Sequence, residues 1–117
     1  MLITLTTTGR RSGQPRETKL YAFEDGKDGN LVVTGSWGGK ATDPAWVLNL
    51  RAHPDAHVSR GRKARTRVRA RETRGSRRER LWRVVTGGFP MYQAYQRKTS
   101  RRFPIFVLEP QDDRDVR

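Results

Sequence analysis

The stretch LITLTTTGRRSGQP, residues 2–15, joins a strand-forming run to a basic turn. Residues 2–8 are mostly β-branched, and such side chains favour extended backbone. Gly9 ends the run, and the serine, glycine and proline that follow are typical turn residues. The sequence therefore predicts a first strand followed by a polar loop.

Further extended segments follow this strand along the chain. Leu20–Phe23 and Leu31–Thr34 are apolar, and the Asp-Gly pairs between them favour an antiparallel hairpin. From Lys63 to Glu72 basic residues alternate with small ones, the period-2 pattern of a strand with one wet face. We expect residues 56–60 to be its hairpin partner and residues 104–108 to form a final strand.

Helices are expected only after the third strand. Asp43 followed by Pro44 predicts an N-cap and a first helical residue, for a helix that ends near His53. Ser76 and Glu79 have capping-box spacing, which predicts a second helix that ends at residues 87–88. A further helical turn passes through residues 92–95.

Five or six short, mostly antiparallel strands with two or three helices predict an α+β domain built as a small barrel. The absence of a βαβ rhythm argues against a Rossmann fold. At 117 residues and 33% hydrophobic content, we expect residues 1–110 to form a single domain and residues 111–117 a charged, flexible tail. No apolar run is long enough to cross a bilayer, so we expect a cytoplasmic protein.

The formal charge of +13 favours polyanionic partners: nucleic acid, anionic lipid or a phosphorylated ligand. The chain has no cysteine, which excludes disulfides, thiolate catalysis and iron–sulfur clusters. Any redox chemistry must therefore come from a bound cofactor. His53 and His57 are separated by the helix-breaking Pro54, and we expect no metal site.

Three segments could carry chemistry. Arg10, Arg11 and Arg16, with hydroxyls and glycine-freed amides around them, could hold phosphate oxygens, or the loop could be an ordinary solvated turn. Residues 35–44 are glycine-rich and lead into a helix start, so they suit a planar anionic ligand or a plain strand–helix connection. The aromatic ridge of residues 89, 92 and 95 could line a pocket or belong to the core.

Together these segments resemble the deazaflavin-dependent nitroreductase family of actinobacteria, which uses coenzyme F420 on a split β-barrel related to FMN-binding proteins. The resemblance rests on blocks in the same order along nearly the whole chain: residues 5–16, Gly38-Gly39, residues 44–54 (PAWVLNLRAHP), residues 92–95 (YQAY), Pro104-Ile105 and Glu109-Pro110. It implies that the reduced deazaflavin transfers a hydride to a small acceptor such as a nitroaromatic, a quinone or an enone.

The resemblance also implies roles for individual residues. The arginines of the loop would bind the cofactor's phosphate and acidic tail, the glycine turn would lie along the ring, and Tyr92, Tyr95 and Ser36 would serve catalysis. The implied cofactor-binding residues are Arg10, Arg11, Arg16, Ser36, Trp37, Gly38, Gly39, Pro44, Ala45, Trp46 and Asn49.

The sequence departs from that family at Trp37, where relatives often have lysine, and at Phe89, which is tyrosine in some relatives. Met1 lies close to the first motif, so we expect the N-terminal segment that covers the substrate side in relatives to be missing. An FMN-binding split barrel remains an alternative, as does a basic nucleic-acid-binding module, which the lack of aromatics beside the arginines of residues 65–71 disfavours. Peripheral contact with an anionic membrane is a further possibility.

Overall fold

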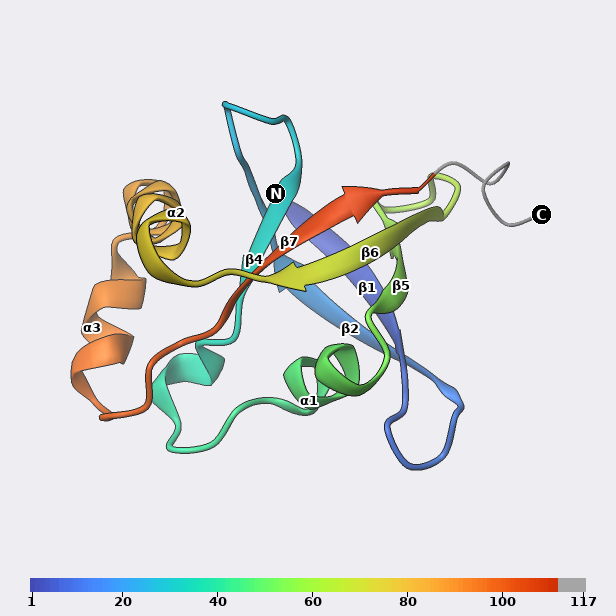
Figure 1. Cartoon of the computed structure of the whole chain (residues 1–117), viewed down its shortest axis with the longest axis horizontal. Helices are drawn as coiled ribbons and strands as arrows, with labels where there is room; N and C mark the ends of the chain where they lie inside the picture. The colour runs from blue at the N-terminus through green and yellow to red at the C-terminus, as the bar shows by residue number, and fades with distance from the viewer. Residues whose placement is uncertain (112–117) are drawn as a thin grey trace.

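The computed structural model describes residues 1–111, so the expected tail lies outside the described residues apart from Gln111. A curled antiparallel sheet and three helices make up the fold (Figure 1). In chain order the elements are β1 (Leu2–Thr8), β2 (Pro15–Tyr21), β3 (Phe23–Glu24), β4 (Leu31–Thr34), the 3-10 turn η1 (Trp37–Gly39), α1 (Ala45–Ala52), β5 (Asp55–Ser59), β6 (Thr66–Glu72), α2 (Gly75–Gly88), α3 (Met91–Arg97) and β7 (Ile105–Pro110).

The described strands form one sheet in the order β2-β1-β5-β6-β7-β4-β3, and each neighbouring pair is antiparallel. The sheet curls into a half-barrel, which confirms the predicted α+β split-barrel class. In β5 and β6 the inner face buries alternate residues, as period 2 requires. Its core, together with residues from α1, comprises Ile3, Leu5, Val33, Trp46, Val47, Leu50, Val58, Val68, Phe106 and Leu108.

Helices α2 and α3 cover the outer face of β7 and β4, on the left of Figure 1. Val32, Ile105 and Val107 point outward from those strands and are fully buried against Leu81 and Val85 of α2. Helix α1 instead packs against β1 and contributes to the inner core. Neither apolar layer covers the edge formed by β2, the first loop and α1. The candidate site lies at this edge.

The predicted hairpin of residues 56–60 with the arginine strand is confirmed, because Ala56 pairs with Val68 and His57 with Arg67. The expected bounds of Leu20–Phe23 were wrong. Strand β2 begins at Pro15, pairs along the whole of β1 and ends at Tyr21, and only Phe23–Glu24 pairs with β4. Strand β2 is an edge strand with no fully buried residue, so its polar sequence carries no clear hydrophobic alternation.

Both predicted helix caps were wrong. Helix α1 is capped by Pro44, while Asp43 directs its carboxylate to two arginines. Helix α2 begins one residue before Ser76, and Glu79 pairs with arginines instead of closing a capping box. In each case a charged partner from elsewhere in the fold replaces the local backbone contact.

Candidate functional site

Two adjoining hollows of about 450 Å³ and about 390 Å³ form one groove beside the edge strand β2. They share Thr18, Trp37, Pro44 and Trp46 as lining residues. The arginine end of the groove is lined also by Thr7, Gly9, Arg10, Arg11, Ser12, Arg16, Glu17, Ala45 and Asn49. The tyrosine end is lined also by Lys19, Leu20, Tyr21, Thr34, Ser36 and Tyr92.

The arginine end carries positive charge that the protein does not neutralise. Within residues 1–111, no carboxylate lies within 4.0 Å of a guanidinium nitrogen of Arg10, Arg11 or Arg16. Nη2 of Arg16 donates to the Ser12 hydroxyl at 3.4 Å, which aims it across the loop. Exposed guanidinium groups converging beside glycine-freed backbone suit phosphate or carboxylate oxygens of a ligand.

The basic loop is fastened to α1 through Asn49, which is 3% exposed. The Asn49 side-chain oxygen accepts from the Arg10 backbone amide at 3.1 Å and from its Nη1 at 3.3 Å. The Asn49 side-chain nitrogen donates to the Thr7 hydroxyl at 3.1 Å. Asn49 therefore lines the groove, as the resemblance implies, and also holds the arginine loop in place.

The middle of the groove lies between two tryptophans. Trp46 is 7% exposed and packs on Phe106 with ring centroids 6.1 Å apart, so it forms a fixed surface. Trp37 is 45% exposed, and Lys40 Nζ lies 4.1 Å from its ring centroid. The backbone of Trp37 has φ of 43°, a left-handed conformation that is uncommon outside glycine. Ser36, which is 7% exposed, lines the tyrosine end from the same turn.

The tyrosine end is backed by an aromatic cluster on and before α3. Tyr92 packs edge-on against Phe89 at 4.9 Å and against Tyr95 at 6.1 Å between ring centroids. Tyr92 is 8% exposed, and the pKa of its phenol is raised chiefly because the side chain is buried. Tyr92 lines this end of the groove, and within residues 1–111 its hydroxyl has no hydrogen-bond partner. A neutral phenol is thus available to a ligand at this end.

The structure brings together most of the residues expected in the site but places three of them, Tyr95, Gly38 and Gly39, outside the groove lining. Tyr95 lines neither hollow and supports Tyr92 from behind. Gly39 faces α3, where an added Cβ would lie 2.6 Å from the Tyr95 carbonyl oxygen, so its role is close packing of the turn. Gly38 has φ of 62° and open space around it.

Strand β2 supplies groove residues that sequence reasoning missed, chiefly Thr18, Lys19 and Tyr21. Their positions follow from the β1–β2 register, in which Thr18 pairs with Leu5 and Tyr21 with Leu2. The described residues contain no cluster of three or more metal-binding side chains. Nor does any helix among them have the length and apolar character needed to cross a membrane.

A curled antiparallel half-barrel with a cationic, aromatic-lined groove at its edge defines a split-barrel protein whose groove suits an anionic ligand with a planar ring. A sequence model of the F420H(2)-dependent quinone reductase family matches residues 1–110, and the chain belongs to that family. It is therefore an F420-dependent oxidoreductase, as the resemblance implied.

Individual relatives agree with this assignment. The chain is 39% identical over 107 residues to an F420H(2)-dependent quinone reductase of Mycobacterium tuberculosis strain H37Rv, a match covering 89% of this chain and 70% of the relative. It is 32% identical over 101 residues to a second protein of that strain, named as a putative F420H(2)-dependent quinone reductase, covering 86% and 82% of the two chains. The solved structure of an F420-H2 dependent reductase (FDR-A) superposes with a TM-score of 0.81 at 35% identity, covering 92% and 93%.

Proposed function

We propose that this protein binds reduced F420 along the groove and transfers its hydride to a quinone. The observation that carries the proposal is the set of uncompensated arginines, Arg10, Arg11 and Arg16, at one end of a groove whose other end is aromatic. An elongated ligand with an acidic tail and a planar ring matches this distribution of charge and apolar surface. The quinone is supported by the family's description and by the names of its relatives.

The protein's part in the reaction is to bind, orient and exclude water. The loop arginines would hold the phosphate and acidic tail, and Asn49 would keep that loop at a fixed distance from α1. Pro44, Ala45 and Trp46 at the start of α1, with Ser36 and Trp37 from the preceding turn, would line the ring. When bound, reduced F420 supplies the hydride.

Tyr92 is the residue we assign to the acceptor. A phenol is protonated at neutral pH, and burial raises the pKa of Tyr92 further, so its hydroxyl can donate a hydrogen bond to a quinone oxygen. That bond stabilises negative charge as it develops on the oxygen, and a proton can then follow through solvent. Tyr95 and Phe89 fix the ring of Tyr92 in place. Nitroaromatics and enones, which also gain negative charge on oxygen, remain secondary acceptors in this proposal.

FMN is the alternative cofactor on a split barrel, and family membership favours F420. A titration of the purified protein with each cofactor, followed by cofactor fluorescence, separates the two. We expect tight F420 binding that weakens with salt, and weak FMN binding. Tight FMN binding with no F420 binding would overturn the assignment.

We further propose a cytoplasmic protein whose groove mouth touches anionic membrane, where a lipid-soluble quinone resides. Tyr21 and Trp37 line the mouth and are 63% and 45% exposed, with Lys19 and Lys40 beside them. Aromatic rings with neighbouring cations suit the membrane interface. Trp37→Ser should reduce sedimentation with vesicles containing phosphatidylglycerol, whereas Arg62→Ala, in the exposed loop between β5 and β6, should not. Equal losses in both variants would indicate diffuse electrostatic attraction only.

The nucleic-acid alternative is less well supported. The arginine strand β6 offers less free charge than its sequence suggests, because Arg69 pairs with Asp55 and Arg71 with Glu109. We propose that nucleic acid is not a physiological partner. A salt-titrated duplex-binding assay should give weak binding with a steep salt dependence and no sequence preference; tight binding that persists at high salt would contradict this.

A further inference from the structure

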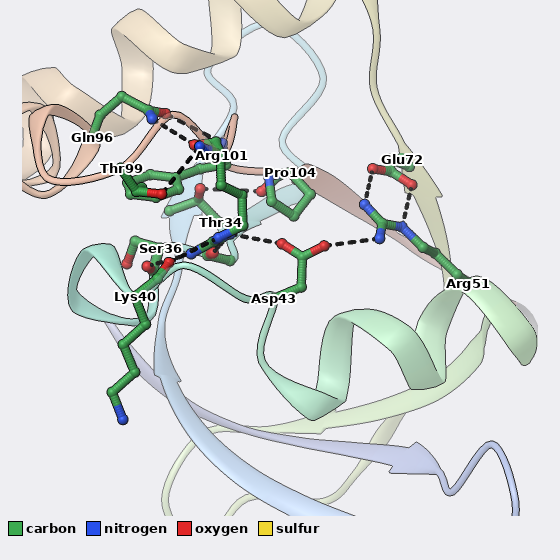
Figure 2. Close-up of polar contacts among 12 residues, drawn as sticks. Thr34, Ser36, Lys40, Asp43, Arg51, Glu72, Gln96, Thr99, Arg101 and Pro104 are labelled. Carbon is green, nitrogen blue, oxygen red and sulfur yellow. Dashed lines mark hydrogen bonds and ion pairs between the residues drawn. The ribbon is translucent and has the colours of Figure 1, made fainter.

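Arg101, which lies between α3 and β7, is 12% exposed in its side chain and lines neither hollow of the groove. Its guanidinium nonetheless donates four hydrogen bonds to one segment of chain, residues 35–43 (Figure 2). Nη1 donates to the carbonyl of Gly35 at 2.8 Å, Nη2 to the carbonyl of Ser36 at 2.9 Å and Nε to the carbonyl of Lys40 at 3.0 Å. These three bonds hold the turn that carries Trp37.

The same guanidinium also fixes the opposite side of the groove. Nη1 of Arg101 donates to Asp43 Oδ1 at 2.7 Å, and Asp43 immediately precedes the Pro44–Trp46 start of α1. The other oxygen of Asp43 accepts from Arg51 Nη1 at 2.9 Å, and Arg51 forms a two-point pair with Glu72 of β6. Figure 2 shows Asp43 lying between the two arginines.

Arg101 is itself firmly held. Its backbone carbonyl accepts from Gln96 Nε2 at 2.7 Å, and its backbone amide donates to the Thr99 hydroxyl at 3.1 Å. Its guanidinium carbon lies 4.8 Å from the ring centroid of Phe103, which is fully buried. The Arg101 side chain is therefore held rigidly, and a rigid, planar guanidinium orients its acceptors more narrowly than a lysine could.

Trp37 explains why such support is needed. It is the one non-glycine residue with positive φ in residues 1–111, and strained backbone persists only where its surroundings over-determine it. The carbonyls on both sides of Trp37, those of Ser36 and Lys40, bond to Arg101. Releasing them allows the turn to relax and Trp37 to leave the groove.

We propose that Arg101, through Asp43, is a positioning residue that sets the spacing between the Trp37 turn and the start of α1, and hence the fit of the deazaflavin ring. The inference rests on the proposed binding of F420 in this groove. Arg101 contacts neither ligand nor reacting atoms and acts only through the two groups of residues that it joins.

The test compares Arg101→Met and the milder Arg101→Lys with Arg102→Met. Arg102 is a neighbouring residue whose side chain is 69% exposed and, within residues 1–111, pairs only with Glu79. Hydrogen exchange followed by mass spectrometry reports the turn without any cofactor. We expect faster exchange in the peptide spanning residues 35–43 for both Arg101 variants, since the amides of Gly39 and Lys40 close this turn. The peptide spanning residues 5–16 and the Arg102→Met protein should match the wild type.

Affinity for F420, measured by cofactor fluorescence, is the second measurement. We expect Arg101→Met to weaken binding between about 10- and 100-fold, and Arg101→Lys less. Asp25→Asn, which removes a buried ion pair beside α2, serves as a destabilised control and should leave the affinity unchanged. Unchanged exchange in residues 35–43, or unchanged affinity despite faster exchange, would overturn the proposal. Failure of the wild-type protein to bind F420 would instead overturn the proposed function.

Discussion

Replacing Arg11 with alanine tests how the groove recognises its anionic ligand. Arg11 lines the arginine end, is exposed, and makes no ion pair within residues 1–111. Its removal leaves no buried group without a partner, so the stability of the fold should change little. The variant therefore isolates binding from folding.

The expected loss follows from the chemistry of one guanidinium. A hydrogen bond to a charged group contributes about 1.5–3 kcal/mol, and a tenfold change in affinity corresponds to about 1.4 kcal/mol. Arg11→Ala should thus weaken F420 binding by about 10- to 150-fold. Because the site is exposed, salt screening should place the loss nearer the lower figure at physiological ionic strength.

Cofactor fluorescence titrations over a range of salt concentrations measure the effect. Between about 0.01 M and about 1 M salt the Debye length falls from about 30 Å to about 3 Å, so the difference between wild type and variant should shrink. Arg62→Ala removes the same charge from the exposed loop between β5 and β6 and is the matched control. Equal weakening by both variants would refute specific recognition by the loop and leave only the overall positive field.

Three further substitutions probe other parts of the structure. Asn49→Ala should lower the midpoint of thermal unfolding and also weaken F420 binding, because the fold loses about 1–3 kcal/mol of stability when Arg10 and Thr7 lose their buried partner. A variant with unchanged stability and normal affinity would contradict this role of Asn49. Tyr92→Phe should lower kcat about 100-fold with little change in F420 affinity, whereas Tyr95→Phe should change kcat far less; an unchanged kcat in Tyr92→Phe would refute a role for its hydroxyl. Asp25→Asn should destabilise the fold by about 1–3 kcal/mol at neutral pH in urea unfolding, because its carboxylate is fully buried against Arg80. The hydrogen bond from Arg80 holds the pKa of Asp25 below its ordinary value, so this contribution is present above that value and is lost as the pH falls through the folded pKa; a difference between the two proteins that does not shrink in acid would refute the assignment.

Local sequence patterns predicted the parts of the fold that local physics governs. The β-branched run of residues 2–8 and the alternation before Glu72 produce strands because their side chains sort between core and solvent. Strand β2 escaped prediction because it is an edge strand with polar residues on most positions, and pairing with β1, not burial, holds it extended.

The site likewise contains residues that local sequence patterns predict and residues that they do not. The arginine loop and the start of α1 were predictable because one contiguous motif carries each of them. Arg101 was not, because its acceptors lie 58 to 66 residues away in the chain and no local pattern links them. Asp43 shows the same limit, since its spacing fits an N-cap but its carboxylate is drawn to Arg101 and Arg51.

The most direct test of the central claim mixes the purified protein with reduced F420 and a soluble quinone and follows the visible absorbance of the oxidised cofactor. The absorbance should return at a rate proportional to enzyme concentration. This rate should saturate with increasing F420 concentration and should fall when Arg11 or Tyr92 is replaced. Binding of F420 with no return of absorbance for any quinone would confine the protein to cofactor binding. No binding of F420 at low salt would contradict the account as a whole.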